Sequence, residues 1–229
     1  MKLLLYSDFK NIGYKYMSKF FDLKEKYICL FINYASEDFE NDEIYTCSAM
    51  EKIKSLNCDI IELNESFDFN SKIDFIFVRG GNTTKLIHLL KKFNQFDKVK
   101  NLVELGTLFI GESAGAVLAG SDTEWTLRTE PYDFDIKNEY GNDALKGYGF
   151  IDKMIFVHCS KYRFPYSCEI IDNKIVRLPN REYYAAYLGD KKLYNKDTYI
   201  TLGNNQVYYV NGNISKILTY DWSKIPVQK

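Results

Sequence analysis

The stretch Thr107-Leu108-Phe109-Ile110-Gly111-Glu112-Ser113-Ala114-Gly115-Ala116-Val117-Leu118 decides the fold that this sequence predicts. Its first part is an apolar run typical of a short buried strand, and the residues after Ser113 are small helix formers. Between them lies Gly-x-Ser-x-Gly, the pattern of a nucleophile elbow, a strained turn from strand to helix. The pattern predicts Ser113 as a nucleophile, with the Ala114 amide at the helix N-terminus as an oxyanion donor.

Strands and helices alternate before this stretch. Short apolar runs predict the strands, and apolar residues at helical spacing predict the helices. The strands are Lys2 to Tyr6, Tyr27 to Asn33, Asp59 to Leu63 and Asp74 to Val78; the helices are Glu43 to Leu56, Thr83 to Phe93 and Asp97 to Leu105. This order predicts an α/β fold with a doubly wound, mostly parallel sheet.

After Leu118 the composition of the chain becomes more polar. Residues 121 to 150 are polar and acidic, which is typical of an irregular excursion above the sheet. Lys153 to Ser160 is again a strand, and Glu182 to Leu188 a short helix. We expect a C-terminal antiparallel β section at the sheet edge, from strands at Thr198 to Leu202, Gln206 to Val210 and Ile214 to Leu218, with an Asn-Gly hairpin turn.

The composition limits the class of protein. A chain of 229 residues suits one α/β domain, so we expect residues 1–229 to form a single hydrolytic domain. The net charge of −1, without a basic block, gives no reason to expect nucleic acid or membrane as a partner. There is no signal-peptide core, and the five scattered cysteines are odd in number, which predicts a cytoplasmic protein with reduced thiols. The oligomeric state is left open.

A serine nucleophile needs a base, and the chain has two histidines. His88 falls on the lysine-rich side of its helix, so we expect a surface residue. His158 ends the apolar strand Met154-Ile155-Phe156-Val157, and strand ends are where α/β proteins bind ligands. His158 is therefore the predicted base, and the chain has too few histidines to favour a metal site.

A second oxyanion donor is expected in Arg79-Gly80-Gly81-Asn82, a glycine turn that follows a predicted strand. This turn, the Gly-x-Ser-Ala-Gly-Ala motif and the strand that ends in His158 together resemble the dipeptidase E (aspartyl dipeptidase) family of serine peptidases, and more distantly the cyanophycinases. The resemblance covers most of the chain, from about residue 27 to about residue 220. It implies a sheet like that of the class I glutamine amidotransferases, Ser113 as nucleophile, His158 as base, and an oxyanion hole formed by the amides of Gly81 and Ala114. No cofactor is needed.

The sequence departs from the family pattern at the third member of the triad. Family members commonly carry an acid after a short strand near the C-terminus. The matching segment here is Leu202-Gly203-Asn204-Asn205-Gln206, which puts Asn204 at that position. An asparagine can orient a histidine, but it lacks the charge that stabilises imidazolium. An acid from the excursion, Glu130, Asp133 or Asp135, is the alternative.

For substrate selection, family members that cleave after an N-terminal aspartate hold its carboxylate with an arginine. Arg181 lies at the matching place, and Arg79 beside the glycine turn is a second candidate. The predicted function is that of a serine hydrolase acting on small peptides, possibly dipeptides with N-terminal Asp. Two alternatives stay open: a weak or inactive relative that binds a small acidic ligand, and an esterase.

Overall fold

The fold was analysed in a computed structural model of the chain. The structure describes residues 1–9, 13–36, 42–123, 126, 145–159, 170–171, 174–175, 199–203 and 206–219.

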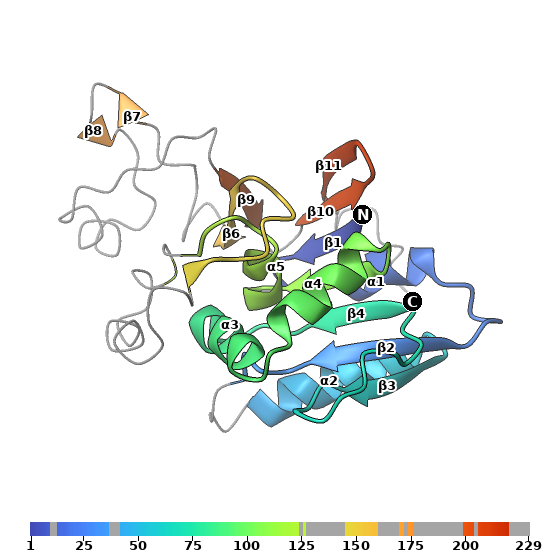
Figure 1. The fold of residues 1–229 in the computed structure, drawn as a ribbon. Helices are drawn as coiled ribbons and strands as arrows, with labels where there is room; N and C mark the ends of the chain where they lie inside the picture. The colour runs from blue at the N-terminus through green and yellow to red at the C-terminus, as the bar shows by residue number, and fades with distance from the viewer. Residues whose placement is uncertain are drawn as a thin grey trace, which may run out of the picture.

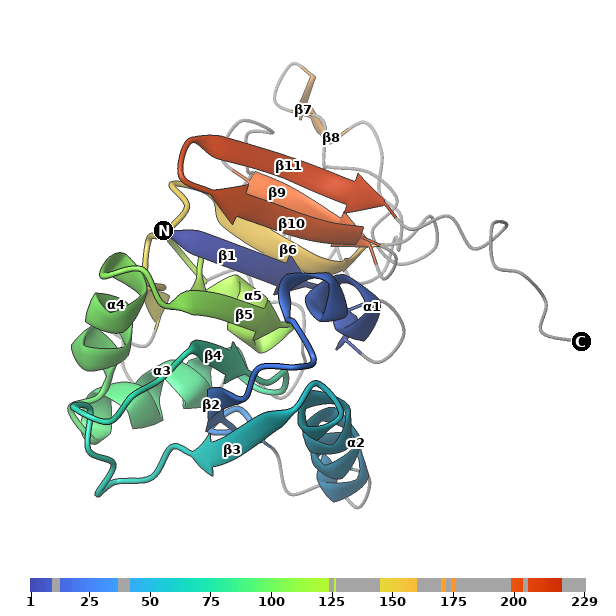
Figure 2. The same ribbon diagram turned by 90° about the vertical axis from the view of Figure 1, so that its right-hand side faces the viewer.

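The centre of the fold is a seven-stranded sheet in the order β11-β10-β1-β5-β4-β2-β3. Its parallel part consists of β1 (Lys2–Tyr6), β5 (Leu108–Glu112), β4 (Phe75–Val78), β2 (Tyr27–Ile32) and β3 (Cys58–Glu62). Two antiparallel strands, β10 (Gln206–Asn211) and β11 (Ile214–Thr219), extend this sheet beyond β1. Figure 2 shows β11, β10, β1 and β5 side by side. The predicted fold class, with its C-terminal antiparallel section, is confirmed.

Helices cover both faces of the sheet. They are α1 (Tyr14–Met17), with the short 3-10 helix η2 (Ser18–Phe20) after it, α2 (Asp42–Lys54), α3 (Thr83–Lys92), α4 (Phe96–Glu104) and α5 (Ala114–Leu118). Figure 1 shows α4 and α5 in front of the sheet and α2 behind it. None of the helices in the described ranges is long and apolar enough to cross a membrane.

The alternation of side chains along the strands builds two cores. On β1, Leu3 and Leu5 point into the cluster that contains α3, α4 and α5, whereas Leu4 and Tyr6 join the cluster with α1 and α2. All four are fully buried. Burying one such side chain stabilises the fold by about 1.5–3 kcal/mol. The continuous apolar runs in the sequence are therefore explained by strands that are covered on both faces.

Two short sheets lie outside the main one. β6 (Met154–Cys159) pairs in parallel with β9 (Tyr199–Gly203), and β9 in turn lies next to β10 (Figure 2). The short strands β7 (Ile170–Ile171) and β8 (Lys174–Ile175) pair with each other. The expectation that the strand near Thr198 belongs to the antiparallel section was wrong, because β9 pairs with β6 and in parallel. The predicted helix from Glu182 to Leu188 lies outside the described residues.

The strand register brings three loops together at one edge of the sheet. Tyr6 at the end of β1 is level with Glu112 of β5, and Val78 at the end of β4 is level with Gly111. The residues that follow β1, β4 and β5 therefore meet at the carboxyl ends of neighbouring parallel strands, where α/β folds bind their ligands.

Candidate active site

Ser113 connects β5 to α5 in a sharp turn. Its φ of 47° and ψ of −107° lie outside the regions that L-residues favour, and such a residue costs about 1–3 kcal/mol. The turn closes only because Gly111 and Gly115, two positions before and after Ser113, lack side chains. A Cβ on Gly111 would lie 2.5 Å from the carbonyl oxygen of Gly115, and one on Gly115 would lie 2.3 Å from that of Val78. The Gly-x-Ser-x-Gly spacing is thus required by close backbone packing.

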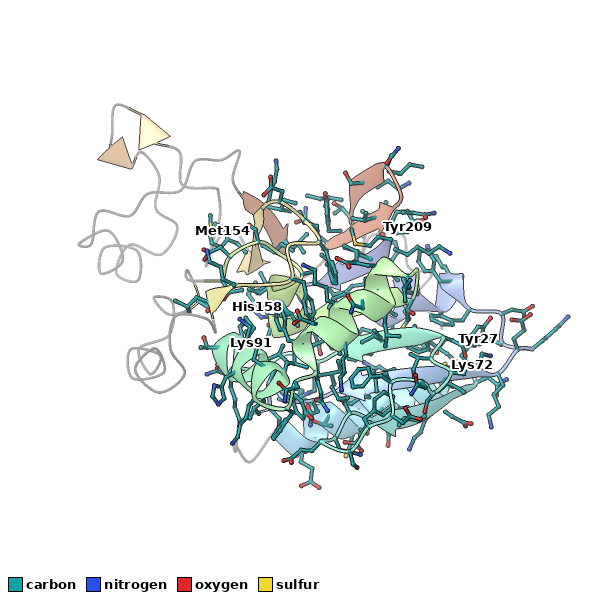
Figure 3. All side chains as sticks on the ribbon, viewed as in Figure 1. Tyr27, Lys72, Lys91, Met154, His158 and Tyr209 are labelled. Carbon is teal, nitrogen blue, oxygen red and sulfur yellow. The ribbon has the colours of Figure 1, made fainter. Side chains whose placement is uncertain are left out.

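The hydroxyl of Ser113 faces His158. Ser113 Oγ lies 2.8 Å from Nε2 of the imidazole, which is hydrogen-bonding distance. His158 lies near the end of β6, beside α5 (Figure 3). Both side chains are partly exposed, so the pair is accessible from outside. The other histidine, His88, is half-buried within α3. A serine whose hydroxyl can pass its proton to a neighbouring imidazole is suited to nucleophilic attack.

The backbone of β6 is irregular at His158. The residue has a φ of 60°, and the pairing of β6 with β9 shifts register between Phe156 and Cys159. Bulges of this kind re-aim a side chain and are common beside active sites. The irregularity turns the imidazole toward Ser113 instead of leaving it in the regular alternation of the strand.

Ser7, which follows β1, contacts the other side of His158. The backbone N–H of His158 donates to Ser7 Oγ at 2.6 Å, and the same oxygen lies 3.4 Å from Nδ1 of the imidazole. The Ser7 side chain is fully buried. Ser7 was not predicted as a site residue. The available signal was a polar residue directly after a predicted parallel strand.

The turn Arg79-Gly80-Gly81 packs against the elbow. A Cβ on Gly80 would lie 2.9 Å from the Cβ of Ser113. Gly81 has a φ of 133°, and a Cβ there would lie 2.0 Å from the carbonyl oxygen of Ala35. Asn82 then begins α3, and its side chain accepts a hydrogen bond from the Lys85 amide at 2.9 Å. The glycine turn is therefore held close to Ser113 by close packing.

Ala114 is the first residue of α5, directly after Ser113. The amides of the first helical turn have no partner within their own helix and point out of its N-terminus. The Ser113 amide, by contrast, donates to the Tyr6 carbonyl oxygen at 2.8 Å, which fixes the elbow to β1. The Ala114 amide therefore lies at the N-terminus of α5, next in the chain to Ser113.

Glu112 links three of the loops at this edge. Its carboxylate accepts the Phe9 amide at 3.1 Å and the Gly80 amide. Burial raises the pKa of Glu112, while the two amides and the positive charge of Arg79 oppose that rise. Asp8 adds a further upward shift to this pKa. Glu112 was not predicted as a site residue, since the variable position of the motif carries no signal.

Arg79 lies inside the protein. Its side chain is 5% exposed, and Nη1 donates to Asn33 Oδ1 at 3.3 Å. Together with its electrostatic effect on Glu112, this contact makes Arg79 part of the support beneath the glycine turn. Its predicted role in substrate binding stays a prediction.

Several predicted site residues lie outside the described residues: Asn204, Glu130, Asp133, Asp135 and Arg181. Gly203, the residue before Asn204, is described, and it pairs in register with Cys159, the neighbour of His158. Within the described part of the chain, no group of three or more His, Cys, Asp or Glu side chains is arranged to hold a metal ion.

The sequence is similar to a known peptidase family and to known peptidases. The sequence pattern of peptidase family S51 matches residues 3–209. Peptidase E of Shewanella sp. (strain W3-18-1) is 28% identical over 197 residues, covering 82% of this chain and 80% of that protein. Peptidase E of Haemophilus influenzae is 32% identical over 130 residues, covering 53% of this chain and 59% of that protein.

A solved structure from Listeria monocytogenes EGD-e, described as a candidate peptidase E, has a similar fold. Its TM-score is 0.71, with 19% sequence identity, over 96% of this chain and 98% of that one. At this identity the likeness shows the fold alone. The resemblance noted from the Gly-Gly-Asn-Thr and Gly-x-Ser-Ala-Gly-Ala motifs is confirmed by the match of the family pattern.

Proposed function

Because this chain belongs to peptidase family S51 and is a serine-type peptidase, we propose that Ser113 is its nucleophile and His158 its general base. The observation that carries this proposal is the 2.8 Å separation of Ser113 Oγ and His158 Nε2 at the strained elbow. The family assignment favours a peptidase over the esterase that the sequence left open. We further propose that the substrates are small peptides, in particular dipeptides with N-terminal Asp.

The reaction would follow the acyl-enzyme route. Ser113 Oγ attacks the carbonyl carbon of the scissile amide while its proton passes to His158 Nε2. The carbonyl electrons move onto oxygen, where the amides of Gly81 and Ala114 donate hydrogen bonds. When the intermediate collapses, the C–N bond breaks and His158 returns the proton to the leaving amine. Water, deprotonated by His158, then cleaves the serine ester and restores the free hydroxyl.

Asn204 is our proposed third member of this triad. Support comes from Gly203, the residue before Asn204. Gly203 pairs with Cys159, the residue that follows His158. Glu130, Asp133 and Asp135 are the alternatives. An asparagine would orient the imidazole without adding a compensating charge, so the imidazolium would be stabilised less than in a Ser-His-Asp triad.

We also propose that the protein works in the cytoplasm, since Cys29, Cys47 and Cys58 are free thiols. We expect it to need no cofactor and no nucleic acid. Residues 1–229 are proposed to act as one hydrolytic domain.

The preference for an acidic N-terminal residue can be measured with Asp-Leu and Asn-Leu, which differ in charge at nearly constant shape. A charge-assisted hydrogen bond from Arg181 contributes roughly 1.5–3 kcal/mol. We therefore expect kcat/KM for Asp-Leu to exceed that for Asn-Leu by about 10- to 150-fold.

The variant Arg181→Ala should remove this preference and leave Asn-Leu hydrolysis nearly unchanged. Arg79→Lys is the matched control, because it keeps the positive charge near Glu112 while testing the second arginine. Equal kcat/KM values for the two dipeptides in the unmodified protein would refute the proposed preference for aspartate. If only Arg79→Lys lost the preference, the assignment to Arg181 would be wrong.

A further inference from the structure

We propose that Ser7 is a positioning residue that holds His158 in the tautomer and orientation needed for attack by Ser113. The inference rests on the proposed role of His158 as base. Its starting point is that one hydroxyl makes two contacts with the same residue, 151 positions away in the sequence. Ser7 Oγ accepts the His158 amide at 2.6 Å and lies 3.4 Å from Nδ1.

The two ring nitrogens of His158 therefore face two different serines. Nε2 lies 2.8 Å from Ser113 Oγ, and Nδ1 lies on the Ser7 side. To accept the proton of Ser113, Nε2 must be unprotonated, so the neutral ring must carry its hydrogen on Nδ1. A hydroxyl oxygen has two acceptor lone pairs, which is enough to accept both the backbone amide and Nδ1–H. Ser7 Oγ can thus accept Nδ1–H in the tautomer that the reaction requires, the same tautomer that a third triad member would favour.

The separation of 3.4 Å is long for a hydrogen bond, which suits a contact that strengthens during the reaction. Hydrogen bonds in resting active sites commonly tighten only when the substrate reacts. Once Nε2 has taken the serine proton, the ring is an imidazolium, and its Nδ1–H becomes a charged donor. A charged donor forms roughly twice as strong a hydrogen bond as a neutral one.

The position of Ser7 explains why it can serve this role. β1 lies directly beside β5, and the Tyr6 carbonyl oxygen accepts the Ser113 amide at 2.8 Å. The strand end that carries Ser7 thus contacts the nucleophile through its backbone and the base through a side chain. β6 belongs to a separate sheet, so the Ser7 hydroxyl links the base to the strand layer that carries the nucleophile.

The backbone contact has a second consequence. His158 has a φ of 60°, a conformation that L side chains rarely adopt. A strained residue of this kind persists only when its surroundings hold it in place. The hydrogen bond from its amide to a fully buried hydroxyl is one such restraint.

The test uses the full chain and the variants Ser7→Ala and Ser7→Thr, assayed for kcat, KM and the pH dependence of kcat/KM. Ser7→Ala should lower kcat by about 10- to 100-fold with little change in KM. The acidic limb of kcat/KM should move down by about 0.5 pH unit, because the imidazolium loses an acceptor. Ser7→Thr, which keeps the hydroxyl, should recover most of the lost rate.

Thr123→Val is the matched control. Thr123 is fully buried, and its hydroxyl has no hydrogen-bond partner within the described part of the chain, so this variant removes a buried hydroxyl with no link to His158. It should leave kcat and the pH profile unchanged. The charged groups at the same strand ends, Asp8, Glu112 and Arg79, are present in every variant. The difference between the variants therefore reports on the Ser7 hydroxyl.

An NMR titration of His158 separates this inference from the proposed function. In Ser7→Ala the pKa of His158 should fall, whether or not the protein turns over substrate. In the unmodified protein above this pKa, the His158 proton should reside on Nδ1. A proton on Nε2, or an unchanged His158 pKa and kcat in Ser7→Ala, would overturn the inference. Absence of hydrolysis in the unmodified protein would instead overturn the proposed function.

Discussion

Glu112 is the residue that connects the most parts of this site. Its carboxylate binds the amides of Phe9 and Gly80 and lies within the electrostatic reach of Arg79. The raised pKa of Glu112 means that the folded protein binds this proton more tightly than the unfolded chain does. Ionisation therefore costs stability as the pH rises from below the ordinary value near 4.5 through the pKa in the folded protein.

The variant Glu112→Gln should lose this dependence. Glutamine keeps an acceptor oxygen for the amides but does not ionise, so its stability relative to the unmodified protein should improve as the pH rises above about 4.5. Urea unfolding at several pH values measures the difference in the free energy of unfolding, provided that the dependence of this free energy on urea concentration is the same in both proteins. A difference in the free energy of unfolding between the two proteins that does not change with pH would contradict the assignment of the raised pKa to Glu112.

Individual site residues were predictable where a motif ties the residue type to a backbone requirement. Ser113 follows from Gly111 and Gly115, whose missing side chains allow the close approaches seen at the elbow. Ser7 and Glu112 were not predictable, since their contacts depend on the register of β1 against β5 and on the irregular backbone of β6. No local pattern encodes either property.

At the scale of elements, the glycine turn between β4 and α3 is the part on which the proposed oxyanion hole depends. Two glycines with positive φ allow a matched comparison. Gly81 has a φ of 133° and the Ala35 carbonyl oxygen beside it, whereas Gly106, after α4, has a φ of 116° and open space around it. Gly106→Ala introduces backbone strain alone, and Gly81→Ala adds a steric clash at the site.

We expect Gly106→Ala to destabilise the fold by roughly 1–2 kcal/mol and to leave kcat unchanged. Gly81→Ala should cost more stability, and it should also lower kcat by about 100-fold or more, because the proposed oxyanion donor is displaced. Peptide hydrolysis under conditions where both variants are folded measures the effect. If both glycine variants lost activity equally, the turn would have no special role in catalysis.

The elements themselves follow largely from periodicity. β2 and β4 were predictable as continuous apolar runs, and α3 from its apolar spacing. The pairing of β6 with β9 was not, because the partner of a strand is not encoded in its own alternation. For this reason the strand near Thr198 was assigned to the wrong sheet.

On the scale of the whole molecule, the parallel order of β1, β5 and β4 explains the position of the site. Each strand ends at the same edge and contributes one part: Ser7 after β1, Ser113 after β5 and the glycine turn after β4. The proposed base, His158, comes from the separate sheet of β6 and β9. Both cores pack against the same sheet and hold its strands in place. The loops at the strand ends therefore stay at fixed distances from one another.

Labelling with a fluorophosphonate probe, with the modified residue identified by mass spectrometry, tests the central claim most directly, because the probe reacts with serines that a neighbouring base activates. The unmodified protein should be labelled at Ser113, and Ser113→Ala should not be labelled. His158→Ala should react slower by on the order of several powers of ten, while His88→Ala should react like the unmodified protein. Equal labelling of the unmodified protein and Ser113→Ala, or no labelling of either, would contradict the account.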